Sequence, residues 1–274
     1  MKLPRKLKGA FVRRPADASK YSVGTVAVVG GSERYPHAPV IAGLGARVAG
    51  AGLVQLVVPD ASRFAAGVHV PEVTFTKLGS SCVFPRADVL VVGMGLGLSR
   101  SSEALVARIL SGGQERIVLD ADALTILAGA KRRKPVKGRE LVLTPHEGEA
   151  ARLLGWTREK VHANRLEAAK GIAARYGATV VLKGARSLVV SADGARVYEN
   201  TTGNPFMALG GMGDLLSGVI GARWAYLGED AFLSAASGVW LHGLASDELV
   251  GAAADPSIAN TAAQLGSLRV RLEK

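Results

Sequence analysis

Short β-branched runs that end in glycine or polar residues alternate with helical segments along most of the chain. Residues 24–29 form one such run before Gly30 and Gly31, and residues 88–92 form another before Gly93. Further strands are predicted over residues 53–58, 116–119, 141–143 and 179–182, and helices over residues 38–52, 101–110, 147–154 and 163–176. This alternation predicts an α/β fold in which a mostly parallel sheet carries helices on both faces, joined by right-handed crossovers.

The last third of the sequence departs from this alternation. Residues 188–191 and 195–199 predict an antiparallel hairpin at the sheet edge. Residues 210–227, 230–249 and 257–272 have the pattern of helices and are expected to cover one face of the sheet. Because neither a repeat nor an interdomain linker interrupts the pattern, we expect residues 1–274 to form a single domain.

Composition excludes several classes of protein. With 48% apolar and 21% charged residues, the chain is neither disordered nor fibrous. Its longest apolar stretches are shorter than the roughly 18 to 20 residues of a membrane span, and residues 1–20 lack the apolar core of a secretory signal. We therefore expect a cytoplasmic protein without a membrane partner. The lone Cys82 excludes an intramolecular disulfide and is interpreted as a buried, inert thiol.

The net charge of +11 is concentrated in two short segments. Residues 1–20 hold seven basic side chains against Asp17 alone, residues 131–139 hold six with no acid, and the remainder has a net charge of −1. We interpret them as a solvated leader and a solvated loop, with a nucleic-acid footprint as the alternative. Neither interleaves several aromatic residues on which single-stranded nucleic acid would stack, so we expect no nucleic-acid partner.

A glycine-rich segment, GGMGD at residues 210–214, comes directly before an apolar helix. Gly210, Gly211, Met212 and Gly213 are predicted to form an anion cradle, because the glycines let the backbone turn and present consecutive N–H groups at a helix start. Asp214 is badly placed to bind a phosphate there, but well placed to take a proton from a hydroxyl that attacks one. The alternative is a glycine-lined helix start that Asp214 caps.

Other polar clusters follow the predicted strands, where ligands bind in parallel sheets. They lie at residues 30–32, 93–97, 120–122, 144–149 and 183–187. Asp120 and Asp122 are candidates for a metal or acid/base pair, although strand-end and helix-cap roles are the favoured interpretation. Arg47 and Arg165 are interpreted as surface residues on helix faces. The standard nucleotide motifs are not matched, since Leu98 stands where a third dinucleotide-binding glycine belongs and residues 183–187 are not a Walker loop.

Taken together, these segments resemble the ribokinase-like superfamily and, within it, the ADP/ATP-dependent NAD(P)H-hydrate dehydratases, the YjeF carboxyl-terminal domain. The resemblance runs from about residue 20 to residue 255 and depends on many motifs in a fixed order. They are VVGGS at 28–32, Ala38 with Pro39, AGAGLV at 49–54, GMGLG at 93–97, DADAL at 120–124, TPH at 144–146 with Glu149, Lys183 with Gly184, GGMGD at 210–214 and LHGLA at 241–245. The resemblance implies a ribokinase-like three-layer sandwich.

The resemblance also implies a function and its residues. Family members use ADP or ATP to phosphorylate the ring hydroxyl of hydrated NADH or NADPH (the S form), after which phosphate leaves and the reduced nucleotide is restored. Asp214 would be the base and would also contact the substrate. The other substrate contacts implied are Ala38, Gly95 and His146, and the nucleotide contacts are Lys183, Gly184, Ala185, Arg186, Ser187 and Gly213. Glu149 would help hold Mg²⁺ through water.

The resemblance further implies a homotetramer, and an epimerase supplied by a separate protein, because the epimerase domain often fused to this one is not found in the sequence. The chain departs from the family pattern at three places in the expected site. Met212 replaces the usual threonine, so a hydroxyl contact to phosphate is lost while the backbone amide remains; Phe206 replaces a small residue and His37 replaces a glycine. A helix cap or a core histidine is the alternative for His146, and a solvated strand end is the alternative for Lys183.

Two other functions remain open from the sequence. A kinase of the same fold, acting on a thiazole or pyrimidine alcohol, would release a stable phosphorylated product. A nucleic-acid-binding protein would use the two basic segments, with binding that weakens steeply as salt is added.

Overall fold

The computed structural model describes residues 3–79, 84–130 and 139–274, and its described strands form one sheet in the order β3-β2-β1-β4-β5-β6-β7-β8-β9. The strands are β1 (Thr25–Val29), β2 (Leu53–Val58), β3 (Thr74–Lys77), β4 (Val89–Val92), β5 (Arg116–Leu119), β6 (Glu140–Leu143), β7 (Thr179–Leu182), β8 (Leu188–Val190) and β9 (Val197–Glu199). β1 to β7 pair in parallel, whereas β8 and β9 pair antiparallel. The predicted parallel sheet and its edge hairpin are therefore confirmed.

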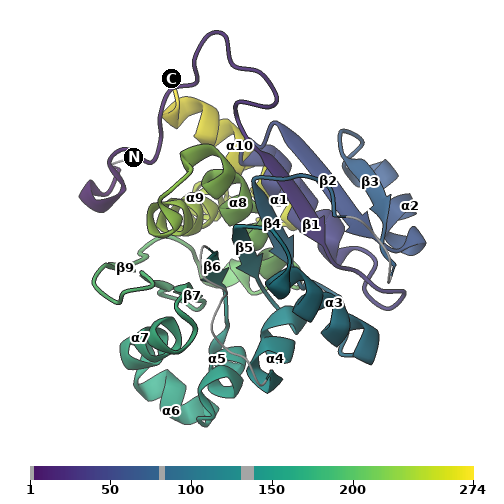
Figure 1. The fold of residues 1–274 in the computed structure, drawn as a ribbon. Helices are drawn as coiled ribbons and strands as arrows, with labels where there is room; N and C mark the ends of the chain where they lie inside the picture. The colour runs from purple at the N-terminus through teal and green to yellow at the C-terminus, as the bar shows by residue number, and fades with distance from the viewer. Residues whose placement is uncertain (1–2, 80–83, 131–138) are drawn as a thin grey trace.

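Helices cover both faces of this sheet (Figure 1). They are α1 (Ala38–Val48), α2 (Asp60–His69), α3 (Arg100–Ser111), α4 (Asp122–Gly129), α5 (Glu147–Leu154), α6 (Arg158–Ala163), α7 (Arg165–Tyr176), α8 (Met212–Leu227), α9 (Ala231–Gly251) and α10 (Ile258–Leu272). Val26 and Val28 of β1 pack with α1, α8 and α9 on one face, while Ala27 and Val29 pack with α3, α4 and α7 on the other. Side chains alternate across a strand, so one β-branched run fills both cores. Within the described residues, no helix has the length and apolar character needed to cross a bilayer.

Several element boundaries differ from those predicted. α2 and β3 were not expected, because α2 leaves Phe64 81% exposed and Val68 78% exposed and so lacks a polar outer face. The helix expected over residues 163–176 is α7 preceded by the separate α6, since Asn164 adopts a non-helical conformation between them. Ser99, rather than a serine within the predicted segment, caps α3 by accepting from Ser102 N.

The basic leader is largely exposed over its described part but is anchored to the core at two residues. Leu7 and Ala10 are fully buried against the core beside α9, and Lys6 Nζ donates to Val197 O at 2.9 Å. Arg223 of α8 donates to Ala10 O. The solvated-leader interpretation is therefore confirmed for most of residues 11–20, which are exposed, but wrong for Leu7 and Ala10, which belong to the core. The interpretations of residues 131–138 and of Cys82 concern positions outside the described residues.

Candidate active site

The carboxyl ends of the parallel strands meet at one edge of the sheet, and the polar segments predicted from the sequence gather there. Asp120 directly follows β5, His146 follows β6, and Lys183 follows β7. The first turn of α8 carries Asp214 to the same edge of the sheet. The charges of Asp120 and Lys183 therefore both act on its carboxyl group.

Lys183 and Asp120 form the centre of this cluster. Lys183 Nζ lies 2.7 Å from Asp120 Oδ1 and 3.9 Å from Glu149 Oε2. Asp120 is 1% exposed, and its Oδ2 accepts a hydrogen bond from Ser217 Oγ at 2.7 Å. Burial by itself would lower the pKa of Lys183, but the carboxylates of Asp120 and Glu149 outweigh burial and raise it. Lys183 is therefore a largely buried, paired cation, and the solvated-strand-end interpretation was wrong.

Asp214 stands in the first turn of α8, at the end of the predicted anion cradle. Gly211 occupies the N-cap position with a φ of +94° and no side-chain cap, so the interpretation of Asp214 as the cap was wrong. Burial, followed by repulsion from Asp120, raises the pKa of Asp214 to about 7. A carboxylate of that pKa accepts a proton near neutral pH far better than an ordinary aspartate. A side chain at Gly213 would place its Cβ 3.3 Å from Lys183 Nζ, so the glycine keeps the cradle close to that cation.

His146 and Glu149 cap the amino end of α5 reciprocally. His146 Nδ1 accepts hydrogen bonds from Gly148 N at 2.9 Å and from Glu149 N at 3.3 Å, while His146 N donates to Glu149 Oε2 at 2.8 Å. The helix-cap interpretation of His146 is thus confirmed. Because Nδ1 accepts, a neutral ring carries its proton on Nε2, and the side chain is 56% exposed.

The two capping groups have shifted pKa values that suit this arrangement. Burial, together with the charge of Lys183, lowers the pKa of His146, which keeps the ring neutral. Burial raises the pKa of Glu149 to about 7, despite the attraction of Lys183. His146 Nε2 lies 3.4 Å from Glu149 Oε1, and the neutral ring places no full positive charge at this position.

Ala38 and Gly95 lie next to each other on the side of the cluster nearer β1 and β4. A Cβ on Gly95, whose φ is +65°, would lie 2.7 Å from Tyr35 Cβ and 3.1 Å from Ala38 Cβ, so only glycine fits between these residues. Asp122 Oδ2 accepts from Gly97 N at 2.7 Å and thereby joins the 93–97 loop to the start of α4. Asp122 is the first residue of α4 rather than its cap, which corrects the helix-cap interpretation.

A cavity of about 490 Å³ opens beside Lys183 on the opposite side of the cluster. It is lined by Lys183, Gly184, Ala185, Ser187, Asn200, Thr202, Gly203, Asn204, Pro205, Met207, Ala208, Met212, Gly213, Leu216, Val239, His242 and Gly243. The cavity has a polar end at Lys183 and Gly213 and an apolar wall at Leu216 and Val239. Ligand pockets of roughly 300 to 1,000 Å³ with a few placed polar groups are typical of cofactor and nucleotide sites.

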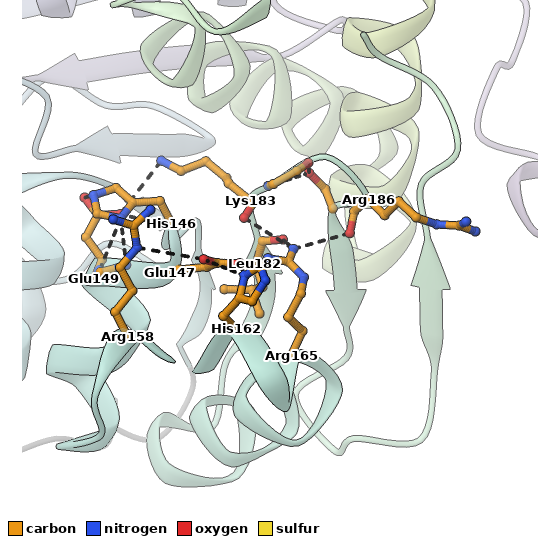
Figure 2. Close-up of polar contacts among 12 residues, drawn as sticks. His146, Glu147, Glu149, Arg158, His162, Arg165, Leu182, Lys183 and Arg186 are labelled. Carbon is orange, nitrogen blue, oxygen red and sulfur yellow. Dashed lines mark hydrogen bonds and ion pairs between the residues drawn. The ribbon is translucent and has the colours of Figure 1, made fainter. Parts of the chain in front are cut away.

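The nucleotide residues expected from the sequence do not all face this cavity. Arg186 is not among its lining residues, and its side chain points away from the cluster (Figure 2) to pair with Glu199 at 2.5 Å. Met212 is buried, packs against Leu215 and Ala262, and lines the cavity with an apolar surface. The departure from the family's threonine is therefore accommodated by packing under the cradle.

Sequence reasoning missed the roles of two residues around the site. Ser217 Oγ donates a hydrogen bond to Asp120 Oδ2. Its position one helical turn after Asp214 indicates that it lies on the same face of the helix, and this could have been predicted from the sequence. Arg165, interpreted as a surface residue, instead lies behind the 183–187 loop and pairs with Glu147 (Figure 2). Arg47 does lie at the surface, 3.8 Å from Glu72, as expected.

Comparisons with known proteins place these features in a family. A family model described as NAD(P)H-hydrate dehydratase matches residues 26–267. The chain is 42% identical to the ADP-dependent (S)-NAD(P)H-hydrate dehydratase of Neisseria meningitidis, over 86% of this chain and 81% of that protein. It is 40% identical to a bifunctional NAD(P)H-hydrate repair enzyme of Moorella thermoacetica over 86% of this chain, but spans only 47% of that longer protein.

The structure is also similar to a solved one. The ADP/ATP-dependent NAD(P)H-hydrate dehydratase of Bacillus subtilis, co-crystallized with ATP and Mg²⁺, matches with a TM-score of 0.87 and 28% identity, over 97% of this chain and 96% of that one. This likeness confirms the expected ribokinase-like fold. The chain belongs to the NAD(P)H-hydrate dehydratase family.

Proposed function

We propose that this protein restores NADH and NADPH from their hydrated S forms, with ADP as phosphoryl donor and ATP as the alternative. The observation that carries the proposal is Asp214, a carboxyl group with a pKa of about 7 at the end of a glycine cradle and beside Lys183, in a chain of this family. A kinase that released a stable phosphorylated product would use the same geometry, and family membership is what argues against it.

The first step transfers a phosphoryl group. Asp214 takes the proton of the ring hydroxyl while that oxygen attacks the terminal phosphorus of the nucleotide. A new P–O bond forms, the bridging P–O bond breaks, and AMP leaves when the donor is ADP. The amides of residues 210–213 and the ammonium of Lys183 stabilise the charge on the phosphoryl oxygens.

The second step eliminates phosphate and a proton from the ring. The C–O bond to the new phosphate breaks and phosphate keeps the electron pair, while the adjacent ring carbon loses a proton to solvent. The electrons of that C–H bond form the ring double bond, so hydrated NADH and ADP yield NADH, AMP and phosphate. Ala38, Gly95 and the half-exposed ring of His146 hold the substrate on the side of the cluster opposite the cavity.

A second cavity, of about 460 Å³, lies along α3 and is lined in part by Gly31, Ser32 and Leu96. None of Ala38, Gly95, His146 and Asp214 lines it, so it does not mark the substrate position. The co-substrate would occupy the 490 Å³ cavity instead, on Lys183, Gly184, Ala185, Ser187 and Gly213, with the backbone of Arg186 completing the loop.

The acidic residues of the site suit a hydrated Mg²⁺ better than a protein-bound one. Among the described residues, no group of three or more His, Cys, Asp or Glu side chains could hold a metal ion directly. The carboxylate of Asp120 pairs with Lys183 and accepts a hydrogen bond from Ser217, and Glu149 Oε2 accepts one from His146 N. Mg²⁺ keeps water readily, so Glu149 would reach it through water while the nucleotide phosphates bind it. When bound, the ion supplies charge neutralisation on those phosphates.

The remaining expectations are proposals of the same kind. We infer that the protein acts in the cytoplasm, as a tetramer of single-domain subunits. We further propose that a separate epimerase supplies the S form of the hydrate. The chain spans about half the length of the bifunctional repair enzyme that it matches. Light scattering of the purified protein would establish the assembly.

The test measures recovery of reduced nicotinamide absorbance from hydrated NADH with Mg²⁺ and either ADP or ATP. Wild-type protein should restore the absorbance, and Asp214→Asn should lower the rate by about 10² to 10⁴. Full activity in that variant would contradict the proposed base. Accumulation of a stable phosphorylated hydrate or alcohol without NADH would instead favour the kinase.

A further inference from the structure

A single guanidinium gathers the backbone of the loop that lines the 490 Å³ cavity. Arg165 Nη2, from the start of α7, donates to Leu182 O at 3.2 Å, to Lys183 O at 3.3 Å and to Arg186 O at 3.3 Å (Figure 2). Arg165 is not itself among the residues that line the cavity. It therefore acts on the loop from behind.

The same guanidinium is anchored to α5. Arg165 Nη1 donates to Glu147 Oε1 at 2.6 Å, and Glu147 lies in the first turn of α5, directly after His146. Burial would raise the pKa of Glu147, but hydrogen bonds from His162 and Arg165 outweigh burial and lower it, so the carboxylate stays charged. Arg158 and His162, the other partners of Glu147, are about three-quarters exposed, whereas Arg165 is only 21% exposed.

We propose that Arg165 and Glu147 are a positioning pair that holds the 183–187 loop in its nucleotide-binding conformation. The inference rests on the proposed function, since it takes the loop to bind ADP. A carbonyl oxygen that turned toward the cavity would repel the nucleotide phosphates, and Arg165 holds three such oxygens by hydrogen bonds. Glu147 fixes the guanidinium relative to the turn of α5 that carries His146 and Glu149, so the loop is set relative to the substrate side as well.

Gly184 fits this arrangement. A Cβ at that position would lie 2.8 Å from both Nη1 and Nη2 of Arg165. The guanidinium cannot easily give way, because Glu147 and the three carbonyls hold it. Gly184→Ala should therefore displace Arg165 and weaken ADP binding as the loss of the arginine does.

The test is titration of ADP with Mg²⁺ into purified protein in the absence of hydrated substrate. Arg165→Met should weaken ADP binding about tenfold, as expected for loss of charge-assisted hydrogen bonds that order a binding loop. Glu147→Gln should weaken ADP binding less than Arg165→Met does. The double variant should bind ADP as tightly as Arg165→Met alone, because the two residues act together. Arg165→Lys should lie between wild type and Arg165→Met, since an ammonium keeps the ion pair but not the three-carbonyl geometry.

Arg175→Met is the matched control, because Arg175 lies on the same helix α7, is similarly half-buried and donates to Leu154 O at 3.1 Å, away from the loop. It should leave ADP affinity unchanged. In turnover assays Arg165→Met should raise the KM for ADP with kcat changed less than about twofold.

The outcomes distinguish failure of the positioning role from failure of the proposed function. ADP affinity unchanged in Arg165→Met, with or without loss of thermal stability, overturns the positioning role and leaves the proposed function standing. A fall in kcat at unchanged ADP affinity also overturns it. Failure of the wild-type protein to bind ADP overturns both. If Arg165→Met does not fold, Arg165→Lys and Glu147→Gln give the same comparison.

Discussion

Lys183 Nζ and Asp120 Oδ1 lie 2.7 Å apart at the ends of two strands that are not neighbours in the sheet, with β6 between them. The ion pair spans this strand at the carboxyl edge and leaves one further contact to Glu149. Asp120 is buried and Lys183 only slightly exposed, so each depends on the other for charge compensation. The free energy of unfolding should therefore depend on this ion pair at the site.

Breaking this pair should cost stability. Among the described residues, Lys183→Met leaves the buried Asp120 carboxylate with Ser217 Oγ as its remaining side-chain partner. The free energy of unfolding should fall by about 3 to 5 kcal/mol, as for other buried pairs that lose one member. Urea unfolding followed by circular dichroism measures the change. Adding Asp120→Asn removes the stranded charge and should recover part of the loss. A single variant as stable as wild type would contradict the buried pairing.

Asp214→Asn should stabilise the protein above neutral pH while removing its activity. The folded-state pKa of Asp214, about 7, is above the ordinary value of 3.8, so the native state holds the proton more tightly than the unfolded state. Stability is then lost as pH rises from about 4 to about 7, and asparagine avoids that loss. At pH 8 the variant should be more stable than wild type by about 1 to 4 kcal/mol. Equal stability at pH 5 and pH 8 in both proteins would contradict the raised pKa.

Turnover should depend on the ionised form of Asp214. Because the proposed base works only when deprotonated, kcat/KM should rise with pH and level off above an apparent pKa of about 7. Glu149 titrates in the same range and shares partners with Asp214, so the observed value belongs to the cluster and not to one residue. A profile already flat between pH 5 and pH 8 would exclude a base with this pKa.

A buried ion pair far from the site offers a second stability test. Arg223 and Glu273, with side chains 1% and 4% exposed, are joined at 2.6 Å between α8 and the carboxyl-terminal end of the chain. Glu273→Gln leaves the Arg223 charge buried without its counter-ion, and should lower the free energy of unfolding by about 3 kcal/mol or more with kcat unchanged. The exposed pair Arg271–Glu248 is the comparison, and Arg271→Ala should cost less than about 1 kcal/mol.

Local sequence patterns determined most of the sheet and the start of the site. The runs that became β1 and β4 contain valine at most positions, which suits strands buried on both faces, and each stops at a glycine. The GGMGD segment predicted a helix start that presents backbone amides. The structure confirms the helix start and places Asp214 there, near Lys183 and Asp120. Such signals are readable because they depend on residues close together in the chain.

The third dimension decided what each polar side chain does. Asp120 and Lys183, 63 residues apart in sequence, become a buried pair only because β5 and β7 flank β6. Arg165 had the pattern of a surface arginine, and α7 must dock beside β7 before its guanidinium can reach the 183–187 carbonyls. The basic leader likewise looked solvated until Leu7 and Ala10 met the core. Burial and pairing between distant segments set the pKa values and the ion pairs, because charge interactions depend on distance and solvent exclusion and not on sequence spacing.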